Sequence, residues 1–287
     1  MGESARAELS FEEWAGDMGR NWLANLARFE GMIAPVGAAL ITHAGFRPGE
    51  NVVDLGCGGG GTTITIARCV SPGGSATGLD ISQDLIDHCG VRASQGTQSR
   101  IYWVCADAAR VIPTNAPFDR LFSRFGSMFF DDAKAGFRNL RRMVKPGGRI
   151  DLAVWGPPAE NEWTRLVNGV IATHLPDAPR PDPRAPGPFA FADTAYLTDV
   201  LEQAGFGRIA IQPFETPLAI GGAGATPQEA AAFVIGSTHM GRLLQNAGPG
   251  KEEAALADLT AAFTPYHVPG KGTLIGGKVW FVTAFAA

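Results

Sequence analysis

Residues 51–61 read Asn-Val-Val-Asp-Leu-Gly-Cys-Gly-Gly-Gly-Gly, a short apolar run followed by five glycines within six positions. A glycine-rich turn at the carboxyl end of a strand lets a flat ligand approach main-chain atoms that a β-carbon would block. The helix that follows such a turn presents free N–H groups on the same side. Asp54 precedes the glycines at a position where a carboxylate is unusual inside a buried parallel strand. The stretch therefore predicts a crevice for a nucleotide-like ligand.

Short apolar runs alternate with helical patterns on the carboxyl side of this stretch. Strands are predicted at 51–55, 75–79, 101–105, 119–123, 148–155, 208–213 and 278–284, and helices at 62–70, 83–94 and 132–144. Strands that alternate with helices at this spacing form βαβ units, and hence a parallel sheet covered on both faces. The predicted fold class is therefore α/β, with a doubly wound, Rossmann-like sheet.

The segments outside this pattern are mostly helical. Residues 10–44 carry apolar side chains at spacings of three and four, and helices are also predicted at 193–204 and 226–264. Segment 176–188 contains six prolines and cannot form a regular element. It is either a surface linker or a stiff loop that positions a cover over a pocket.

The composition is that of an ordinary globular chain, since 45% of the 287 residues are hydrophobic and 18% are charged. The net charge of −4 lacks the basic footprint of nucleic-acid-binding proteins, so no nucleic-acid partner is expected. The four cysteines form no Cys-x-x-Cys pair, which argues against a zinc site or a disulfide framework. No apolar run approaches ~18 residues, and the first residues are polar and include acids. These features predict a soluble, cytoplasmic protein without a membrane association.

The glycine run by itself fits two ligands. Gly56, Gly58 and Gly61 satisfy G-x-G-x-x-G, the dinucleotide fingerprint, whereas Gly56, Gly58 and Gly60 satisfy G-x-G-x-G, the pattern of S-adenosylmethionine (SAM) enzymes. Asp80, at the end of the second predicted strand, suits either ligand because a carboxylate there accepts from ribose hydroxyls. The glycines alone leave both possibilities open.

Five stretches, in the same order and at the expected spacing, resemble the motifs of class I SAM-dependent methyltransferases. They lie at 52–60, 78–82, 105–108, 118–123 and 140–149. The resemblance implies a sheet of seven strands with the last one antiparallel, SAM as cofactor and S-adenosylhomocysteine (SAH) as product. The overall pattern, including 124–130, is similar to that of quinone-biosynthesis and related small-molecule methyltransferases.

The same resemblance implies an organisation around the cofactor. It consists of a helical cover at 1–44, a SAM-binding core at 45–155, a helical and proline-rich insertion at 156–207, and the C-terminal part of the sheet at 208–287, interrupted by a helical insertion at 221–270.

Cofactor-binding residues are carried over from the family motifs position by position. The resemblance implies that Asp80 holds the ribose, that Asp107 accepts from the adenine amine and that Asp54 lies near the donor's ammonium group. A helix cap is the simpler role for Asp107, and an anchor for the turn is the simpler role for Asp54. The full predicted set is Asp54, Gly56, Cys57, Gly58, Gly60, Asp80, Ile81, Asp107, Ala108 and Ser123.

The family reaction is direct displacement of the sulfonium methyl group by a nucleophile, which depends mainly on in-line alignment. Apolar residues beyond the fourth strand favour a small, hydrophobic or aromatic acceptor that is methylated on oxygen, nitrogen or carbon. Residues predicted to bind this acceptor are Trp22, Arg124, Phe125 and Trp155. If the acceptor is a hydroxyl, His174 and His239 are the predicted bases, because they lie in the two insertions expected to cover the substrate.

No metal is expected, since no acid closes the fourth strand as in the magnesium-dependent catechol type. Two other classes of function remain open. One is a protein that binds SAM without methylating, as a cyclase or regulator, and the other is an NAD(P)-dependent oxidoreductase. The expected partner is a small-molecule substrate, and whether the chain forms a homodimer is left open.

Overall fold

A computed structural model describes residues 11–94, 99–178 and 182–287. Residues 1–10 of the predicted N-terminal cover and the centre of the proline-rich segment lie outside these ranges. Within them, eight strands form one sheet, and no helix is long and apolar enough to cross a bilayer. The strands are β1 (Asn51–Leu55), β2 (Ser75–Asp80), β3 (Arg100–Cys105), β4 (Phe118–Arg124), β5 (Val144–Trp155), β6 (Phe206–Ile220), β7 (His267–Val268) and β8 (Gly272–Ala286).

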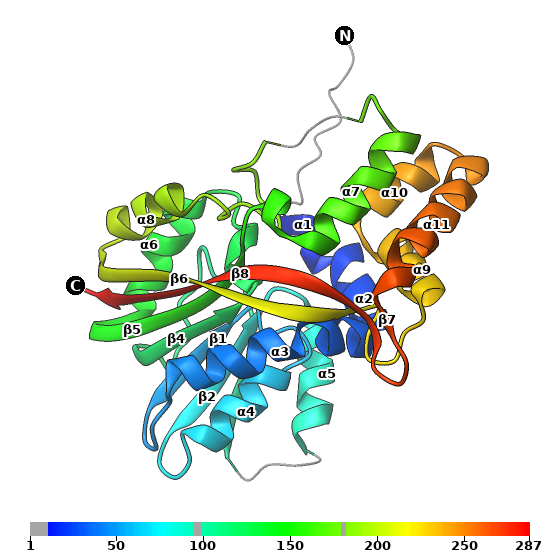
Figure 1. Cartoon of the computed structure of the whole chain (residues 1–287). Coiled ribbons are helices and arrows are strands. Elements are labelled where there is room, and N and C mark those ends of the chain that lie inside the picture. The colour runs from blue at the N-terminus through cyan, green and yellow to red at the C-terminus, as the bar shows by residue number, and fades with distance from the viewer. Residues whose placement is uncertain (1–10, 95–98, 179–181) are drawn as a thin grey trace.

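Neighbouring strands follow the order β3-β2-β1-β4-β5-β8-β6, and β7 pairs with β8 outside this path (Figure 1). The chain moves outward from β1 through β2 to β3 and then returns to β4, on the other side of β1. Because β1 to β5 are parallel, their carboxyl ends lie at one edge of the sheet. The boundary between β1 and β4 is therefore the topological switch point, where open α/β sheets bind their ligands.

Strand β8 is antiparallel to both of its main neighbours, β5 and β6. The predicted doubly wound sheet with an antiparallel last strand is thus confirmed, and the short β7 adds one strand to the seven expected. Both β6 and β8 extend well beyond the predicted ranges. Their outer halves pair with each other, from Glu215 opposite Lys278 to Ile220 opposite Thr273, in a curved ribbon past the other strands (Figure 1).

Helices cover both faces of the sheet, as expected for alternating strands and helices. Helices α3, α4 and α5 lie on one face, and α6 and α8 lie on the other (Figure 1). A further group, formed by α7, α9, α10 and α11, packs together beside the outer halves of β6 and β8. The helices are α1 (Phe11–Ala15), α2 (Asp17–Ala24), α3 (Leu26–Ala44), α4 (Gly61–Cys69), α5 (Gln83–Ser94), α6 (Ala133–Met143), α7 (Glu162–His174), α8 (Thr194–Gln203), α9 (Pro227–Ser237), α10 (His239–Asn246) and α11 (Pro249–Phe263), with 3-10 turns η1 (Gly126–Phe129), η2 (Pro158–Glu160) and η3 (Thr264–Tyr266).

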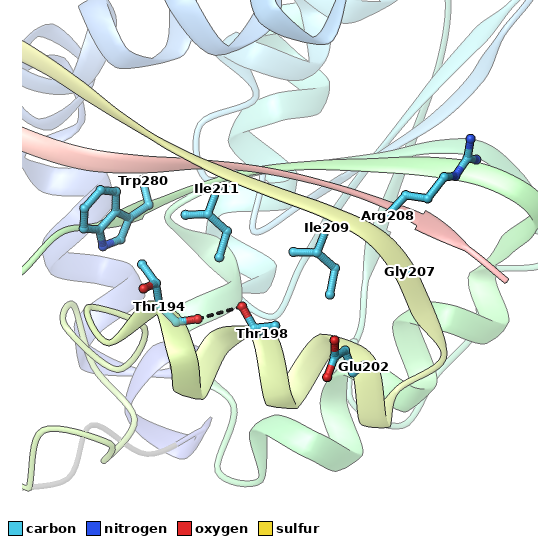
Figure 2. A pocket seen from close by; sticks show the side chains of 8 residues that line it. All are labelled: Thr194, Thr198, Glu202, Gly207, Arg208, Ile209, Ile211 and Trp280. Atoms are coloured by element: carbon cyan, nitrogen blue, oxygen red, sulfur yellow. Dashed lines mark hydrogen bonds between the residues drawn. The ribbon is translucent and has the colours of Figure 1, made fainter.

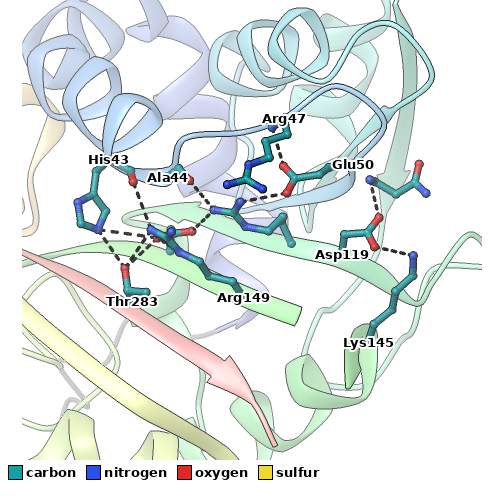
Figure 3. Close-up of polar contacts among 11 residues, drawn as sticks. His43, Ala44, Arg47, Glu50, Asp119, Lys145, Arg149 and Thr283 are labelled. Atoms are coloured by element: carbon teal, nitrogen blue, oxygen red, sulfur yellow. Dashed lines mark hydrogen bonds and ion pairs between the residues drawn. The ribbon is translucent and has the colours of Figure 1, made fainter. Parts of the chain in front are cut away.

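A buried polar network fixes the C-terminal end of α3 on the sheet (Figure 3). The fully buried carboxylate of Asp151 accepts from Arg120 at 2.7 Å, from Arg149 at 2.5 Å and from Thr283 at 2.9 Å. The Thr283 hydroxyl also lies 3.0 Å from Nε2 of His43, near the end of α3. Every charge in this cluster has an ion-pair partner, so the burial of these charges is compensated, although Nε of Arg120 itself has no hydrogen-bond partner among the described residues. The network therefore anchors α3, whose other end reaches the glycine turn.

Candidate functional site

The glycine turn joins β1 to α4 at the switch point. Gly56, Gly58 and Gly60 have left-handed backbones, with φ of 64°, 54° and 77°, a region that side chains disfavour. A β-carbon on Gly56 would also lie 2.6 Å from Cα of Gly126, at the start of η1. The turn therefore requires glycine for its conformation and for its close contact with the loop after β4.

Asp54 anchors the start of α4. Its carboxylate is buried, and Oδ2 accepts from the hydroxyls of Thr62 at 2.7 Å and Thr63 at 2.6 Å. Burial raises the pKa of Asp54 from 3.8 to about 6, although both threonines and the charge of Arg124 act in the opposite direction. Both hydroxyls bind Oδ2, and Oδ1 makes no hydrogen bond with the described residues. The anchoring role considered for Asp54 is present, and the second oxygen leaves room for a ligand contact.

Asp80 lies beside the turn at the carboxyl end of β2. Its Oδ2 accepts from the N–H of Gly58 at 2.8 Å, and its Oδ1 accepts from the N–H of Ser82 at 3.1 Å. Burial raises the pKa of Asp80, and the backbone donors partly oppose this increase. Ile81, the next residue, is half-buried, and its carbonyl accepts from Cys105 Sγ at 3.4 Å. The backbone thus fixes a carboxylate whose remaining lone pairs are available to hydroxyl groups.

Other predicted cofactor residues have local structural partners. Asp107 accepts from the N–H of Ala109 at 2.8 Å within a turn, and no helix begins there, so Asp107 stabilises the turn and does not cap a helix. Ala108 is buried, and its carbonyl accepts from Asn139 at 2.9 Å. The Ser123 hydroxyl is also buried and donates to the carbonyl of Leu55 at 2.9 Å, which ties β4 to β1.

The side chain of Cys57 is directed into a small apolar cluster below the turn, with Ile86, Cys89 and Trp103. Cys89 Sγ donates to the carbonyl of Gly58 at 3.1 Å. A hydrogen bond with Cys89, together with burial, raises the pKa of the Cys57 thiol well above its ordinary value. Cys57 therefore remains a protonated thiol, and only its backbone is available to a ligand in the turn.

The N-terminal helices cover the glycine turn. Trp22 of α2 stacks on Phe29 of α3, with ring centroids 4.1 Å apart, and its Nε1 lies 3.4 Å from the position of a β-carbon on Gly58. Glu30 of α3 binds Arg92 of α5 at 2.8 Å, and Arg92 donates to the carbonyl of Gly59 at the same distance. This ion pair joins α3 and α5 across the turn. Trp22 therefore lies directly against the predicted cofactor turn.

Aromatic residues continue from this cover past the ends of β4 and β5. Phe125 stacks on Trp155 at 4.5 Å, and Trp155 lies 5.5 Å from Trp163 at the start of α7. Phe125 has a φ of 67°, an unusual backbone for a bulky residue that is characteristic of functional sites. Trp14 of α1 packs edge-on against Phe129 of η1 at 4.8 Å.

Three buried polar atoms within this aromatic region have no hydrogen-bond partner among the described residues. They are Nε1 of Trp14, Oγ of Ser127 and Nε1 of Trp163. Buried polar groups are normally paired, and leaving one unpaired costs ~1–3 kcal/mol. Trp14, Ser127 and Trp163 were not predicted as site residues from the sequence. Whether a polar atom lacks a partner depends on the tertiary structure, which residue types alone do not reveal.

The two predicted bases lie on the helical group beside the sheet. His174 ends α7, eleven residues after Trp163, and its Nε2 lies 2.8 Å from Oδ2 of Asp258 on α11. Because an α-helix rises 1.5 Å per residue, His174 lies about 16 Å along α7 from Trp163. His239 begins α10, and its side chain lies outside the described part of the structure. Among all the described side chains, no group of three or more His, Cys, Asp or Glu residues is placed to hold a metal ion.

A cavity of about 460 Å³ lies away from these residues, between α8 and the edge strand β6 (Figure 2). Strand β6 lies four strand spacings, or about 19 Å, from β1, which leads into the glycine turn. None of the residues predicted from the sequence lines it. Its lining consists of Thr194, Thr198, Glu202, Gly207, Arg208, Ile209, Ile211 and Trp280.

The strand order, the glycine turn at the switch point and the carboxylate that ends β2 define a class I SAM-dependent methyltransferase fold. Comparisons with known proteins agree, since residues 52–148 match a family model described as a methyltransferase domain. Residues 52–148 thus resemble a methyltransferase domain, and the chain is similar to members of the quinone-biosynthesis group.

Two curated relatives illustrate the similarity. A nocamycin O-methyltransferase from Saccharothrix syringae is 28% identical over 180 residues, which are 60% of this chain and 64% of that protein. A demethylmenaquinone methyltransferase from Lactobacillus johnsonii is 30% identical over 113 residues, which are 39% of this chain and 46% of that protein. The chain thus spans less than two thirds of the length of these relatives.

A solved structure supports the fold. Phosphoethanolamine N-methyltransferase 2 from Haemonchus contortus, in complex with SAM, has a TM-score of 0.58 and 16% sequence identity, and the match covers 97% of this chain and 60% of that chain. SAM is the methyl donor of this class. Asp80, held by two backbone donors beside glycines that leave the turn open, fits the ribose of such a donor.

Proposed function

We propose that this chain catalyses methyl transfer from SAM to a small organic acceptor by direct displacement. The observation that carries the proposal is the carboxylate of Asp80, fixed by the N–H groups of Gly58 and Ser82 at the switch point. A carboxylate held in this way accepts from two neighbouring hydroxyls, as a ribose presents them. When bound, SAM supplies a methyl group on a positively charged sulfur.

The other cofactor contacts follow from the same geometry. The backbone of Gly56 and Gly58 lines the amino-acid tail of the donor, and Asp107 retains lone pairs for the adenine amine after its contact with Ala109. Trp22 closes the turn from the outside. These residues hold the donor in one orientation, and such alignment contributes up to ~7–11 kcal/mol to the lowering of the barrier.

The acceptor is hydrophobic or aromatic and carries at least one oxygen or nitrogen that accepts hydrogen bonds. Phe125, Trp155 and Trp163 supply planar apolar surfaces beyond β4 and β5. The unpaired donors on Trp163 and Ser127 then bind the polar atom of the acceptor, which compensates for their burial. The similarity to a nocamycin O-methyltransferase and to a demethylmenaquinone methyltransferase supports an acceptor of this kind.

Transfer is proposed to need no metal ion. His174 is bound to Asp258 on the helical group, so an acceptor atom that is already nucleophilic, such as an amine, an enolate carbon or an ionised phenol, fits the site best. Turnover in the presence of a strong chelator should then equal turnover without it.

Binding and transfer are tested separately. Calorimetric titration with SAM and SAH measures cofactor binding, and incubation with methyl-labelled SAM and a panel of phenols, amines and carboxylic acids measures transfer. Asp80→Asn should weaken binding, and the exposed Asp84→Asn is the matched control. Cofactor binding without labelled product on any acceptor would favour the non-methylating alternative. Binding of NAD(P)H in place of SAM would refute the proposal.

A further inference from the structure

Arg124 is the last residue of β4, at the carboxyl edge of the sheet beside the glycine turn. Its side chain lies against α3 at Gly37, where a β-carbon would come within 2.7 Å of Nη1. A glycine in the middle of a helix costs stability, and here it provides the space that the guanidinium group occupies. The local structure of α3 therefore accommodates the cation of Arg124.

The guanidinium group of Arg124 has no hydrogen bond or ion pair within the described part of the chain. The residue is only partly exposed, and burial lowers the pKa of Arg124 from its ordinary value. A buried arginine normally makes several hydrogen bonds, since an unpaired charge in such surroundings is costly. Its small exposed fraction shows that the group borders space that water or a ligand can enter.

Nearby carboxylates influence Arg124 without binding it. Asp54 and Glu30 both stabilise its charge. Glu30 is already paired with Arg92, at 2.8 and 3.0 Å, and Oδ2 of Asp54 is bound by two threonine hydroxyls. Neither carboxylate lies within the 4.0 Å of an ion pair with Arg124. The carboxyl edge of the sheet thus holds the guanidinium group of Arg124, with five unpaired N–H donors. Near it lies the buried carboxylate of Asp54, with one unpaired oxygen.

We infer that Arg124 binds a carboxylate of the ligand, and that this carboxylate is the one on the amino-acid tail of the methyl donor. The inference rests on the proposed function. An α-amino acid carries a carboxylate and an ammonium group on one carbon, so a single tail meets Arg124 with the first and Asp54 with the second. The planar guanidinium group binds a carboxylate through two parallel hydrogen bonds, which a lysine does not reproduce.

Ligands with and without the amino-acid tail test this inference by calorimetry. SAH contains the tail, and 5′-methylthioadenosine retains the adenine and ribose but lacks it. In Arg124→Met, the affinity for SAH should fall about ten- to hundredfold, the loss typical of a charge-assisted hydrogen bond, while 5′-methylthioadenosine binds within twofold of the unchanged protein. Arg124→Lys should recover part of the affinity for SAH. The exposed Arg138→Met is the matched control and should bind both ligands normally.

Each other outcome overturns a defined part of the inference. Unchanged SAH affinity in Arg124→Met would show that the tail does not contact Arg124. Equal losses for SAH and 5′-methylthioadenosine would show that Arg124 only maintains the shape of the site. Normal SAH affinity with a raised KM for a carboxylic acid acceptor would show that Arg124 binds the carboxylate of the acceptor and not that of the methyl donor. If the unchanged protein bound no SAH, the proposed function itself would fail.

Discussion

Replacing Asp54 by asparagine tests the electrostatics below the glycine turn. Burial raises the pKa of this carboxyl from 3.8 to about 6, so the folded chain holds the proton more tightly than the unfolded chain does. Below about pH 4 the carboxyl is protonated in both states, and above about pH 6 it is ionised in both. The free energy of unfolding therefore falls as pH rises through this window. A shift of about two pKa units corresponds to on the order of 3 kcal/mol.

Urea unfolding between pH 4 and pH 7 measures this effect. Asp54→Asn keeps an oxygen that accepts from Thr62 and Thr63 but cannot ionise. The variant should match the unchanged protein at pH 4 and exceed it at pH 7 by up to about 3 kcal/mol. Asp84→Asn, on the exposed face of α5, should show no such trend. A stability difference that does not depend on pH, or a variant that is less stable at pH 7, would refute the reasoning.

Three further substitutions test other parts of the site. Gly56→Ala places a β-carbon 2.6 Å from backbone at a φ of 64° and should destabilise the fold by more than about 2 kcal/mol in thermal unfolding, whereas Gly90→Ala, in an open helical position, should be neutral or stabilising by up to ~1 kcal/mol. Asp80→Asn should lower SAH affinity by about ten- to hundredfold in calorimetry without changing the melting temperature by more than a few degrees. His174→Ala should retain turnover within about twofold. Its free energy of unfolding should fall by at most ~1 kcal/mol, since the ring is bound to an exposed carboxylate of α11. Loss of turnover would instead show that His174 is the base.

The sheet was predictable where local patterns and the fold agree. Strands β1 and β2 lie within one residue of their predicted ends, because apolar runs and glycine turns bound them. The outer halves of β6 and β8 were missed because Pro217 and the glycines at 276 and 277 are typical of strand ends. These residues are tolerated there because the two outer halves form a ribbon beyond the main sheet.

The site was only partly predictable, for a different reason. Residues of the glycine turn, together with Asp54 and Asp80, form a local motif, and Thr62 and Thr63 at the start of α4 could have indicated the anchoring of Asp54. The ion pair of Glu30 with Arg92 joins residues 62 positions apart, and no local pattern indicates it. The predictions for His174 and His239 relied on insertions being close to the substrate. Sequence does not specify which end of an inserted helix faces the site.

The two ends of α3 show why the carboxyl edge is a binding site. At the C-terminal end, the buried carboxylate of Asp151 is bound by Arg120, Arg149 and a hydroxyl, so every charge is compensated within the chain. Near the glycine turn, Asp54 is ionised only at a cost and Arg124 has no partner among the described residues. Asp54 is as deeply buried as Asp151, so burial of the carboxylate alone does not explain the difference. A fold retains unpaired charges when a ligand completes them, and the turn between β1 and α4 is where this chain retains them.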